Sequence, residues 1–243
     1  EGDRVVYVVA SPGCYSTARI VSADVLLKIP SELDFEMAAG MLLKGMTVSY
    51  LFKRVANLQP FHKVLFHAAA GGTGLIAMQW ARMMDVEITG TVSSEEKKEL
   101  AKNYGAANVI NYARENFVEQ IRDITQGRGV DVVFDSVGAS TFYQSIQSLK
   151  KYGLMVSYGN ASGKVSAFDL GLLSGHLFIT RPTLWSYVAT RKELEVTFGE
   201  LLQLVMLNKI RITIYQKKPL QDVVALHKLM EERRTTGCSI LTV

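Results

Sequence analysis

The 243-residue sequence is poor in the side chains that build metal centres and disulfide frameworks. It holds only two cysteines, Cys14 and Cys238, which lie far apart in the chain, and four histidines. No Cys-x-x-Cys motif occurs, and no histidine stands at metal-ligand spacing from a cysteine or a carboxylate. We therefore expect no metal site. We interpret the cysteines as free thiols of a reducing compartment, which predicts a cytoplasmic protein.

Long apolar runs and one-sided charge are also missing. No apolar run reaches the roughly 20 residues that span a bilayer, so we expect no membrane partner. The 27 Lys and Arg residues nearly balance the 23 Asp and Glu residues, and they are scattered. A nucleic-acid footprint needs a clustered basic stripe, so we do not expect a nucleic acid as partner. Hydrophobic residues at 48% and charged residues at 21% fit a folded protein of one or two domains.

From residue 63 onward, short apolar runs alternate with amphipathic stretches. Six runs have the composition of buried strands, and they occupy residues 64–68, 86–91, 108–110, 130–134, 154–158 and 177–180. Helical stretches such as 74–84, 95–104 and 117–125 lie between them. Nearly continuous apolar strands separated by helices predict a parallel sheet with both faces covered. The doubly wound α/β fold that binds nucleotides, the Rossmann fold, fits this pattern best.

The flanking regions carry simpler patterns. A strand is expected over residues 4–9, helices over 192–208 and 220–233, and a final strand over 239–243. Residues 35–55 are also helical in pattern. Because Gly40 and Gly45 interrupt that stretch, we expect two helices or a bend there.

A glycine-rich turn, Gly71-Gly72-Thr73-Gly74, follows the first of the six runs and opens a helix. Glycines let the backbone approach a pyrophosphate, whose charge is met by amides at the helix N-terminus. The alternative is a tight turn that binds nothing. Because the turn follows the first strand of a βαβ series, we favour a dinucleotide site.

The second run ends near Ser93, where a site for NAD usually carries an acidic residue that holds the ribose 2′-hydroxyl. Lys97 follows four residues later. A hydroxyl and an ammonium suit a 2′-phosphate, which a carboxylate would repel, so we predict NADPH as the cofactor. The alternative is that Lys97 is one of several exposed lysines at the start of a helix, since Lys98 and Lys102 are close by.

Further loop residues follow the later strands at regular intervals. Tyr112 comes after the third strand, 136–138 after the fourth and 159–160 after the fifth. Ligands bind at the carboxyl edge of such sheets, so the regular placement favours contact, although each residue alone could be an ordinary loop residue. His67 lies inside the first run and is interpreted as a core histidine. No Gly-x-Ser-x-Gly motif appears, so nucleophilic hydrolysis has no support.

Several motifs together resemble the zinc-free quinone oxidoreductases of the zeta-crystallin type, in the medium-chain dehydrogenase/reductase superfamily. The matching segments run in order along nearly the whole chain: 43–48, 67–74, 109–112, 134–138, 153–160, 180–182 and 233–237. The resemblance implies a Rossmann domain inserted in a GroES-like, β-rich catalytic domain. By this resemblance the chain begins within the catalytic domain, which is therefore expected to be truncated at its N-terminus here. The expected divisions are 1–43 for the remnant of the catalytic domain, 44–182 for the NADP-binding domain and 183–243 for the C-terminal part of the catalytic domain.

The resemblance also implies cofactor contacts. Carried over residue by residue, they fall on Tyr50, Gly72, Thr73, Ser93, Lys97, Tyr112, Ser136, Tyr158, Gly159, Asn160, Arg181 and Arg233. Two positions depart from the family. Many members have a lysine where this chain has Cys238, so a contact there lacks support. Others have phenylalanine at the position of Tyr158, and the tyrosine preserves an aromatic wall.

The implied reaction is hydride transfer from NADPH to a quinone without a metal. Related alcohol dehydrogenases use zinc to stabilise an alkoxide. A quinone is already electrophilic and its reduced anion is delocalised, so orientation in a cleft is expected to suffice. We name no catalytic residue and no proton donor.

Two alternatives remain open beside quinone reduction. One is an NADPH-dependent reductase of an enone or alkenal, with the same fold. The other is a non-catalytic NADPH-binding protein, structural or RNA-binding, which the zeta-crystallin resemblance allows. In each case the resemblance, together with the apolar segments 170–173 and 177–179 beside the last strand, predicts a homodimer formed through the cofactor domain.

Overall fold

The computed structural model describes residues 1–8 and 11–243. The chain divides into two compact units. Residues 1–50, 71–76 and 184–243 form the first unit, and residues 51–70 and 77–183 form the second. Within the described residues, no helix is long and apolar enough to cross a membrane.

The second unit is built on a six-stranded sheet in the order β5-β4-β3-β6-β7-β8, with every neighbouring pair parallel. The strands are β3 (Lys63–Phe66), β4 (Glu87–Val92), β5 (Asn108–Asn111), β6 (Val130–Asp135), β7 (Leu149–Ser157) and β8 (Phe178–Thr180). This is the strand order of the doubly wound dinucleotide-binding fold. The predicted Rossmann fold is therefore confirmed, and the six expected strands are all present.

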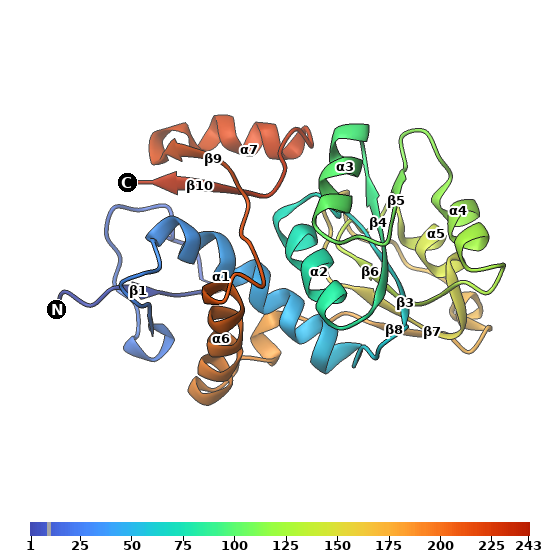
Figure 1. Ribbon diagram of the computed structural model, residues 1–243, viewed down its shortest axis with the longest axis horizontal. Helices are drawn as coiled ribbons and strands as arrows, with labels where there is room; N and C mark the ends of the chain where they lie inside the picture. The colour runs from blue at the N-terminus through green and yellow to red at the C-terminus, as the bar shows by residue number, and fades with distance from the viewer. Residues whose placement is uncertain (9–10) are drawn as a thin grey trace. The chain divides into compact units, whose positions relative to one another are not determined.

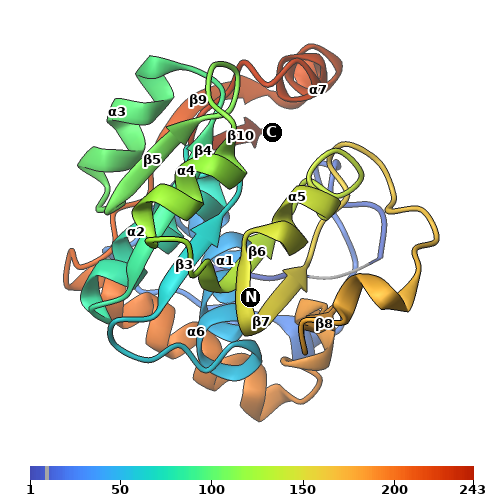
Figure 2. The same ribbon diagram turned by 90° about the vertical axis from the view of Figure 1, so that its right-hand side faces the viewer.

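Helices cover both faces of this sheet. Figure 1 shows α2 (Gly72–Met83) and α3 (Glu95–Asn103) against one face, and α4 (Phe117–Ile124) and α5 (Phe142–Gln147) against the other. The turned view in Figure 2 shows the strands side by side between the helices. Large side chains fill the interior, since Trp80, Phe66 and Phe134 are all buried. Burial on both faces explains why these strands are nearly continuous apolar runs.

The first unit combines helices with two small sheets. Its longer helices are α1 (Phe35–Tyr50), α6 (Arg191–Met206) and α7 (Val223–Glu231), with short 3₁₀ turns at Ala23–Val25, Leu184–Ser186 and Leu220–Asp222. β1 (Val5–Val6) pairs antiparallel with β2 (Leu27–Lys28), and β9 (Ile214–Pro219) pairs in parallel with β10 (Cys238–Thr242). Figure 1 shows α7 beside the β9–β10 pair. Of the strand expected over residues 4–9, only Val5–Val6 is a strand, and Val9 lies outside the described residues.

The two helices expected from an interruption at Gly40 and Gly45 are not found there, because α1 runs unbroken through both positions. A Cβ at Gly45 would lie 2.4 Å from the Cδ1 of Leu201 in α6. That glycine therefore lets a second helix approach α1 closely. The change in helix geometry comes later, where a π-helical turn over Leu51–Val55 follows Tyr50.

Candidate cofactor site

The glycine-rich turn joins β3 to α2. Beyond the end of β3 the chain remains paired with the sheet, since the His67 amide donates to the Phe134 carbonyl at 3.1 Å. Gly72 is the first residue of α2, and Thr73 is the second. Amides in the first turn of a helix lack intrahelical acceptors and favour an anion. The turn therefore suits the phosphate contacts predicted for these two residues.

The predicted pair for the 2′-phosphate is brought together at the end of β4. The Lys97 ammonium lies 3.5 Å from the hydroxyl of Ser93. Ser94 caps α3, and its hydroxyl accepts from the Lys97 amide at 3.3 Å. The cationic side chain and the helix N-terminus thus lie at the same strand end, where both favour an anion.

Neighbouring charges at this helix have other partners. The Lys98 ammonium pairs with Glu115 at 3.2 Å. The Glu95 carboxylate accepts from the Asn111 amide nitrogen at 2.7 Å. That hydrogen bond is the main cause that holds the pKa of Glu95 below its ordinary value. The side chains of Lys97 and Lys98 therefore contact different groups, Ser93 and Glu115, although the two residues are adjacent in the chain.

The loops after β6 and β7 pack backbone against backbone. A Cβ at Gly159 would lie 2.3 Å from the carbonyl oxygen of Ser136. Gly138 has φ +91°, and a Cβ there would lie 2.6 Å from the Gly163 carbonyl oxygen. Only glycine fits such close approaches. Ser136 and Gly159 therefore lie together in one surface at the carboxyl edge of the sheet.

Arg181 ties the end of β7 to the loop that follows it. Its Nη1 donates to the Ser157 carbonyl at 2.8 Å. In the hydrogen-bonded orientation of the Asn160 amide, its oxygen accepts from Arg181 Nη2 at 3.1 Å and its nitrogen donates to the Gly159 carbonyl at 2.8 Å. The half-buried Tyr158 has its ring 6.1 Å from the ring of Phe66.

The three remaining predicted cofactor contacts are Tyr112, Tyr50 and Arg233, and they lie outside the loops that follow β4, β6 and β7. Tyr112 follows β5 and is partly exposed. Tyr50 and Arg233 belong to the first unit, as do Gly72 and Thr73. Tyr50 is buried and stacks on Tyr187, with ring centres 4.7 Å apart and planes 14° apart. No role for Tyr187 was predicted from the sequence.

Beneath the Ser136 loop lies a buried polar network that was not predicted from the sequence. Asp135 is fully buried at the end of β6. Its Oδ1 accepts from the amides of Val137 and Gly138, at 2.7 and 3.0 Å. Its Oδ2 accepts from the hydroxyls of Thr141 and Ser145, at 2.7 and 2.9 Å. Four donors thus satisfy the carboxylate and fix the start of the loop. The signal in the sequence was Asp135, an acidic residue that directly follows the apolar segment 132–134 at the end of β6.

His67 extends this network and is the core histidine that the sequence predicted. It is buried, with Nε2 2.9 Å from the Ser145 hydroxyl and Nδ1 2.9 Å from the Thr91 hydroxyl. Because Ser145 donates its proton to Asp135, it accepts from Nε2–H of the histidine, and Nδ1 accepts from Thr91. Burial lowers the pKa of His67, although Asp135 opposes this. The ring is therefore neutral, as this chain of donors requires.

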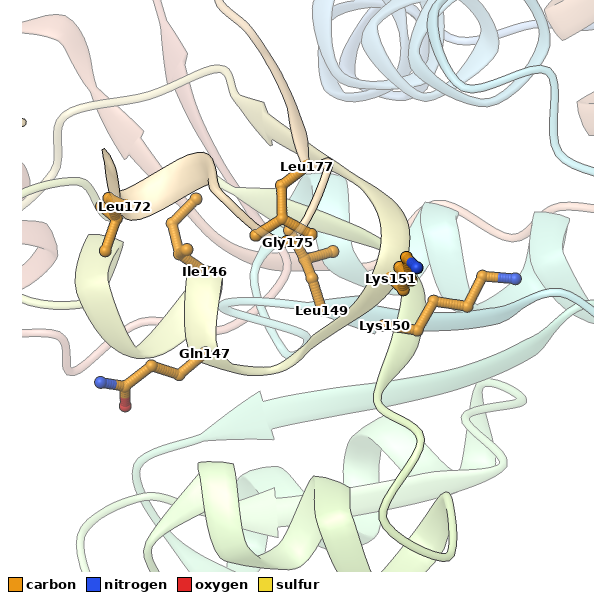
Figure 3. A pocket seen from close by; sticks show the side chains of 8 residues that line it. All are labelled: Ile146, Gln147, Leu149, Lys150, Lys151, Leu172, Gly175 and Leu177. Atoms are coloured by element: carbon orange, nitrogen blue, oxygen red, sulfur yellow. The ribbon is translucent and has the colours of Figure 1, made fainter. Parts of the chain in front are cut away.

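A separate hollow of about 430 Å³ lies beside the start of β7. Figure 3 shows its apolar lining, which includes Leu149, Leu172 and Leu177. Lys150 stands at its edge and pairs with Asp131. None of the predicted cofactor contacts lines this hollow.

The described residues contain no group of three or more His, Cys, Asp or Glu side chains placed to hold a metal ion. Cys14 is exposed and Cys238 is buried, and both are free thiols.

Quinone oxidoreductases and a 2-haloacrylate reductase are among the known proteins similar to this chain. A family model described as zinc-binding dehydrogenase matches residues 72–203. Quinone oxidoreductase 1 of Escherichia coli K12 is 43% identical over 244 residues, which cover 99% of this chain and 75% of that protein. A 2-haloacrylate reductase from a Burkholderia species is 40% identical over 246 residues, which cover 99% and 74%. The crystal structure of Escherichia coli quinone oxidoreductase complexed with NADPH matches with a TM-score of 0.97 at 43% identity, covering 100% of this chain and 76% of that chain.

Proposed function

The chain belongs to the quinone oxidoreductases of the medium-chain dehydrogenase/reductase superfamily, and we propose that it is an NADPH:quinone oxidoreductase. NADPH, when bound, supplies the hydride that a quinone accepts. The observation that carries this function is the 43% identity to a quinone oxidoreductase solved with NADPH, over the whole of this chain. The Ser93–Lys97 pair supports the same cofactor, because it offers a cation where a carboxylate would repel a 2′-phosphate.

The contacts we propose for NADPH are Tyr50, Gly72, Thr73, Ser93, Lys97, Tyr112, Ser136, Tyr158, Gly159, Asn160, Arg181 and Arg233. Two observations support the fit of this cofactor. The backbones of Ser136 and Gly159 pack directly against each other without an intervening side chain, which brings these two predicted contacts together. A cation and a helix N-terminus lie together at Ser93 and Lys97, as a phosphate requires.

We further propose that the protein needs no metal and that its residues act by orientation. A quinone needs little electrophilic help, because its reduced anion is delocalised. The residues named above hold the donor, and the buried Asp135 network keeps the Ser136 loop in one conformation. Holding two reactants in the right geometry can contribute about 7–11 kcal/mol to lowering a barrier. We assign no proton donor to the protein.

We propose the same domain division as above, with 44–182 as the cofactor domain and 1–43 and 183–243 as parts of the catalytic domain. The compact unit of residues 51–70 and 77–183 holds the parallel sheet and supports a cofactor domain, whereas residues 44–50 and 71–76 belong to the first unit. The boundary between residues 43 and 44 lies inside α1.

A second candidate function is the reduction of an activated alkene. It is favoured by the 40% identity to a 2-haloacrylate reductase. The decisive experiment follows NADPH oxidation by its absorbance, with a series of quinones and a matched series of enones and haloacrylates. We expect a higher kcat/KM for quinones. A higher kcat/KM for the alkenes would favour the second candidate, and oxidation with neither series would favour a non-catalytic NADPH-binding protein.

We also propose a homodimer formed through the edge of the sheet, and a cytoplasmic location. β8 is the last strand of the sheet order, and Phe178 in it is 59% exposed. Leu170, in the turn before β8, is 76% exposed. A second copy that pairs with this edge would cover the apolar side chains. The free thiols of Cys14 and Cys238 support a reducing compartment.

A further inference from the structure

The glycine at position 72 makes room for a lysine. A Cβ at Gly72 would lie 2.5 Å from Cδ and 2.7 Å from Cε of Lys44, and 2.8 Å from Sγ of Cys238. Any other residue at position 72 would therefore displace the Lys44 side chain from the start of α2. Lys44 comes from α1, and a bridge between Gly71 and Gly237 holds the start of β10 against the same turn.

The charge of Lys44 is not neutralised by these neighbours. Cys238 is buried, and this burial raises the pKa of its thiol, although Lys44 opposes the rise through its charge and a hydrogen bond. The thiol is therefore protonated at neutral pH, and it donates to the Gly40 carbonyl at 3.3 Å. The half-buried Lys44 thus rests against a glycine and a neutral sulfur.

This is an unfavourable place for a cation alone. The first-turn amides of α2 carry the positive end of the helix dipole, which repels cations and attracts anions. Lys44 packs onto that turn with its Cδ and Cε. A bound anion reverses the balance, because the amides and the ammonium then attract the same charge.

We propose that Lys44 is a further cofactor-binding residue, whose ammonium acts with the α2 amides on the pyrophosphate that NADPH and NADH share. The inference rests on the proposed function, since it takes a nicotinamide dinucleotide as the ligand. It gives the two lysines different tasks. Lys97 recognises the 2′-phosphate, which only NADPH carries, whereas Lys44 binds the part common to both cofactors.

The test is the dissociation constant of each cofactor for Lys44→Met, measured by isothermal titration calorimetry on the full chain. Methionine keeps an unbranched side chain over Gly72 and removes the charge. A charge-assisted contact to phosphate corresponds to about 10- to 150-fold in affinity. We expect NADPH and NADH to weaken by the same factor, of at least about 10-fold. Lys209→Met removes the same charge from an exposed position after α6, and should leave both constants unchanged.

The outcomes separate this inference from the proposed function. Unchanged affinity in Lys44→Met, or a loss for NADPH alone, overturns the role of Lys44 and leaves the proposed function intact. A wild-type protein that does not bind NADPH overturns the proposed function, and this inference with it. If Lys44→Met loses affinity and also has a lower melting temperature, a disturbed fold could explain the loss. Gly72→Ala then separates the two explanations, because its Cβ displaces the Lys44 side chain. That variant must weaken both cofactors in the wild type, and must weaken them much less when Lys44→Met is already present. Equal losses in both backgrounds would overturn the inference.

Discussion

The ammonium of Lys97 lies 3.5 Å from the hydroxyl of Ser93. Lys98, the next residue, pairs instead with Glu115 at 3.2 Å. Two adjacent lysines on one helix therefore face different groups, and only Lys97 stands at the predicted 2′-phosphate position. This arrangement makes Lys98 a matched control for Lys97, since the two substitutions remove the same charge from the same helix.

The first prediction concerns cofactor preference. Lys97→Ala should weaken NADPH binding about 10- to 150-fold, because a charge-assisted contact to phosphate contributes about 1.5–3 kcal/mol. NADH binding should barely change, since NADH has no 2′-phosphate, and Lys98→Ala should affect neither cofactor. Fluorescence titration of both cofactors against both variants measures this. Equal losses of NADH and NADPH in Lys97→Ala would mean that the lysine only supports the fold.

The second prediction concerns acid stability. The pKa of His67 in the folded protein is lowered by burial, whereas in the unfolded chain it is about 6.5. Below that pH the unfolded chain binds a proton that the folded protein does not. The contribution of neutral His67 to the free energy of unfolding is therefore fully present above about pH 6.5 and is lost as the pH falls below it. The slope is at most about 1.4 kcal/mol per pH unit. The free energy of unfolding can be measured with urea at pH 7.5 and 5.5, on either side of about 6.5. Its decrease between these two pH values should be smaller for His67→Asn than for the wild type. The exposed His176 provides a control, and His176→Asn should retain the full decrease.

The third prediction concerns Asp135. In Asp135→Asn the amide nitrogen cannot accept from the Thr141 and Ser145 hydroxyls. The Thr141 hydroxyl keeps the Gly138 carbonyl as an acceptor at 3.2 Å, whereas the buried Ser145 hydroxyl loses its acceptor, so we expect a loss of about 1–3 kcal/mol in the free energy of unfolding. NADPH affinity should fall as well, because the Ser136 loop loses its anchor. Asp123→Asn, at an exposed position, should change stability by less than about 0.5 kcal/mol. If Asp135→Asn unfolds at the same midpoint as the wild-type protein, the Asp135 network does not stabilise the fold.

The fourth prediction concerns assembly through β8. Light scattering should show a dimer for the wild type and a monomer for Phe178→Lys, because a buried, unpaired ammonium at the interface is strongly unfavourable. Phe61 is 84% exposed and lies before β3, so Phe61→Lys should leave the dimer intact. A wild-type protein that is monomeric at micromolar concentration would rule out this interface.

The fifth prediction concerns metals. NADPH oxidation with a quinone should persist after exhaustive dialysis against a chelator, because the proposed chemistry needs no Lewis acid. Elemental analysis of the purified protein should find zinc well below one equivalent. Stoichiometric zinc would overturn this prediction.

Much of the fold could be read from local patterns. A strand buried on both faces must be apolar at nearly every position, so the six runs were visible without any knowledge of their partners. The glycine turn and the Ser93–Lys97 spacing are local as well, because Lys97 follows Ser93 by only four positions, across the start of α3. The sequence by itself thus determined the Rossmann fold, the family and the cofactor.

Contacts between distant segments were decided only by the tertiary structure. The periodic pattern of α1 does not reveal that Gly45 faces Leu201, so a glycine that allows close packing was misread as a helix interruption. The partners of Asp135 come from a loop and a helix start whose positions depend on how α5 packs on the sheet. Cys238 and Gly40, which are 198 residues apart, meet beside the turn that also receives Lys44. Local sequence encodes burial and backbone preference, whereas the choice of a distant partner depends on the packing of the whole core, which no single segment contains.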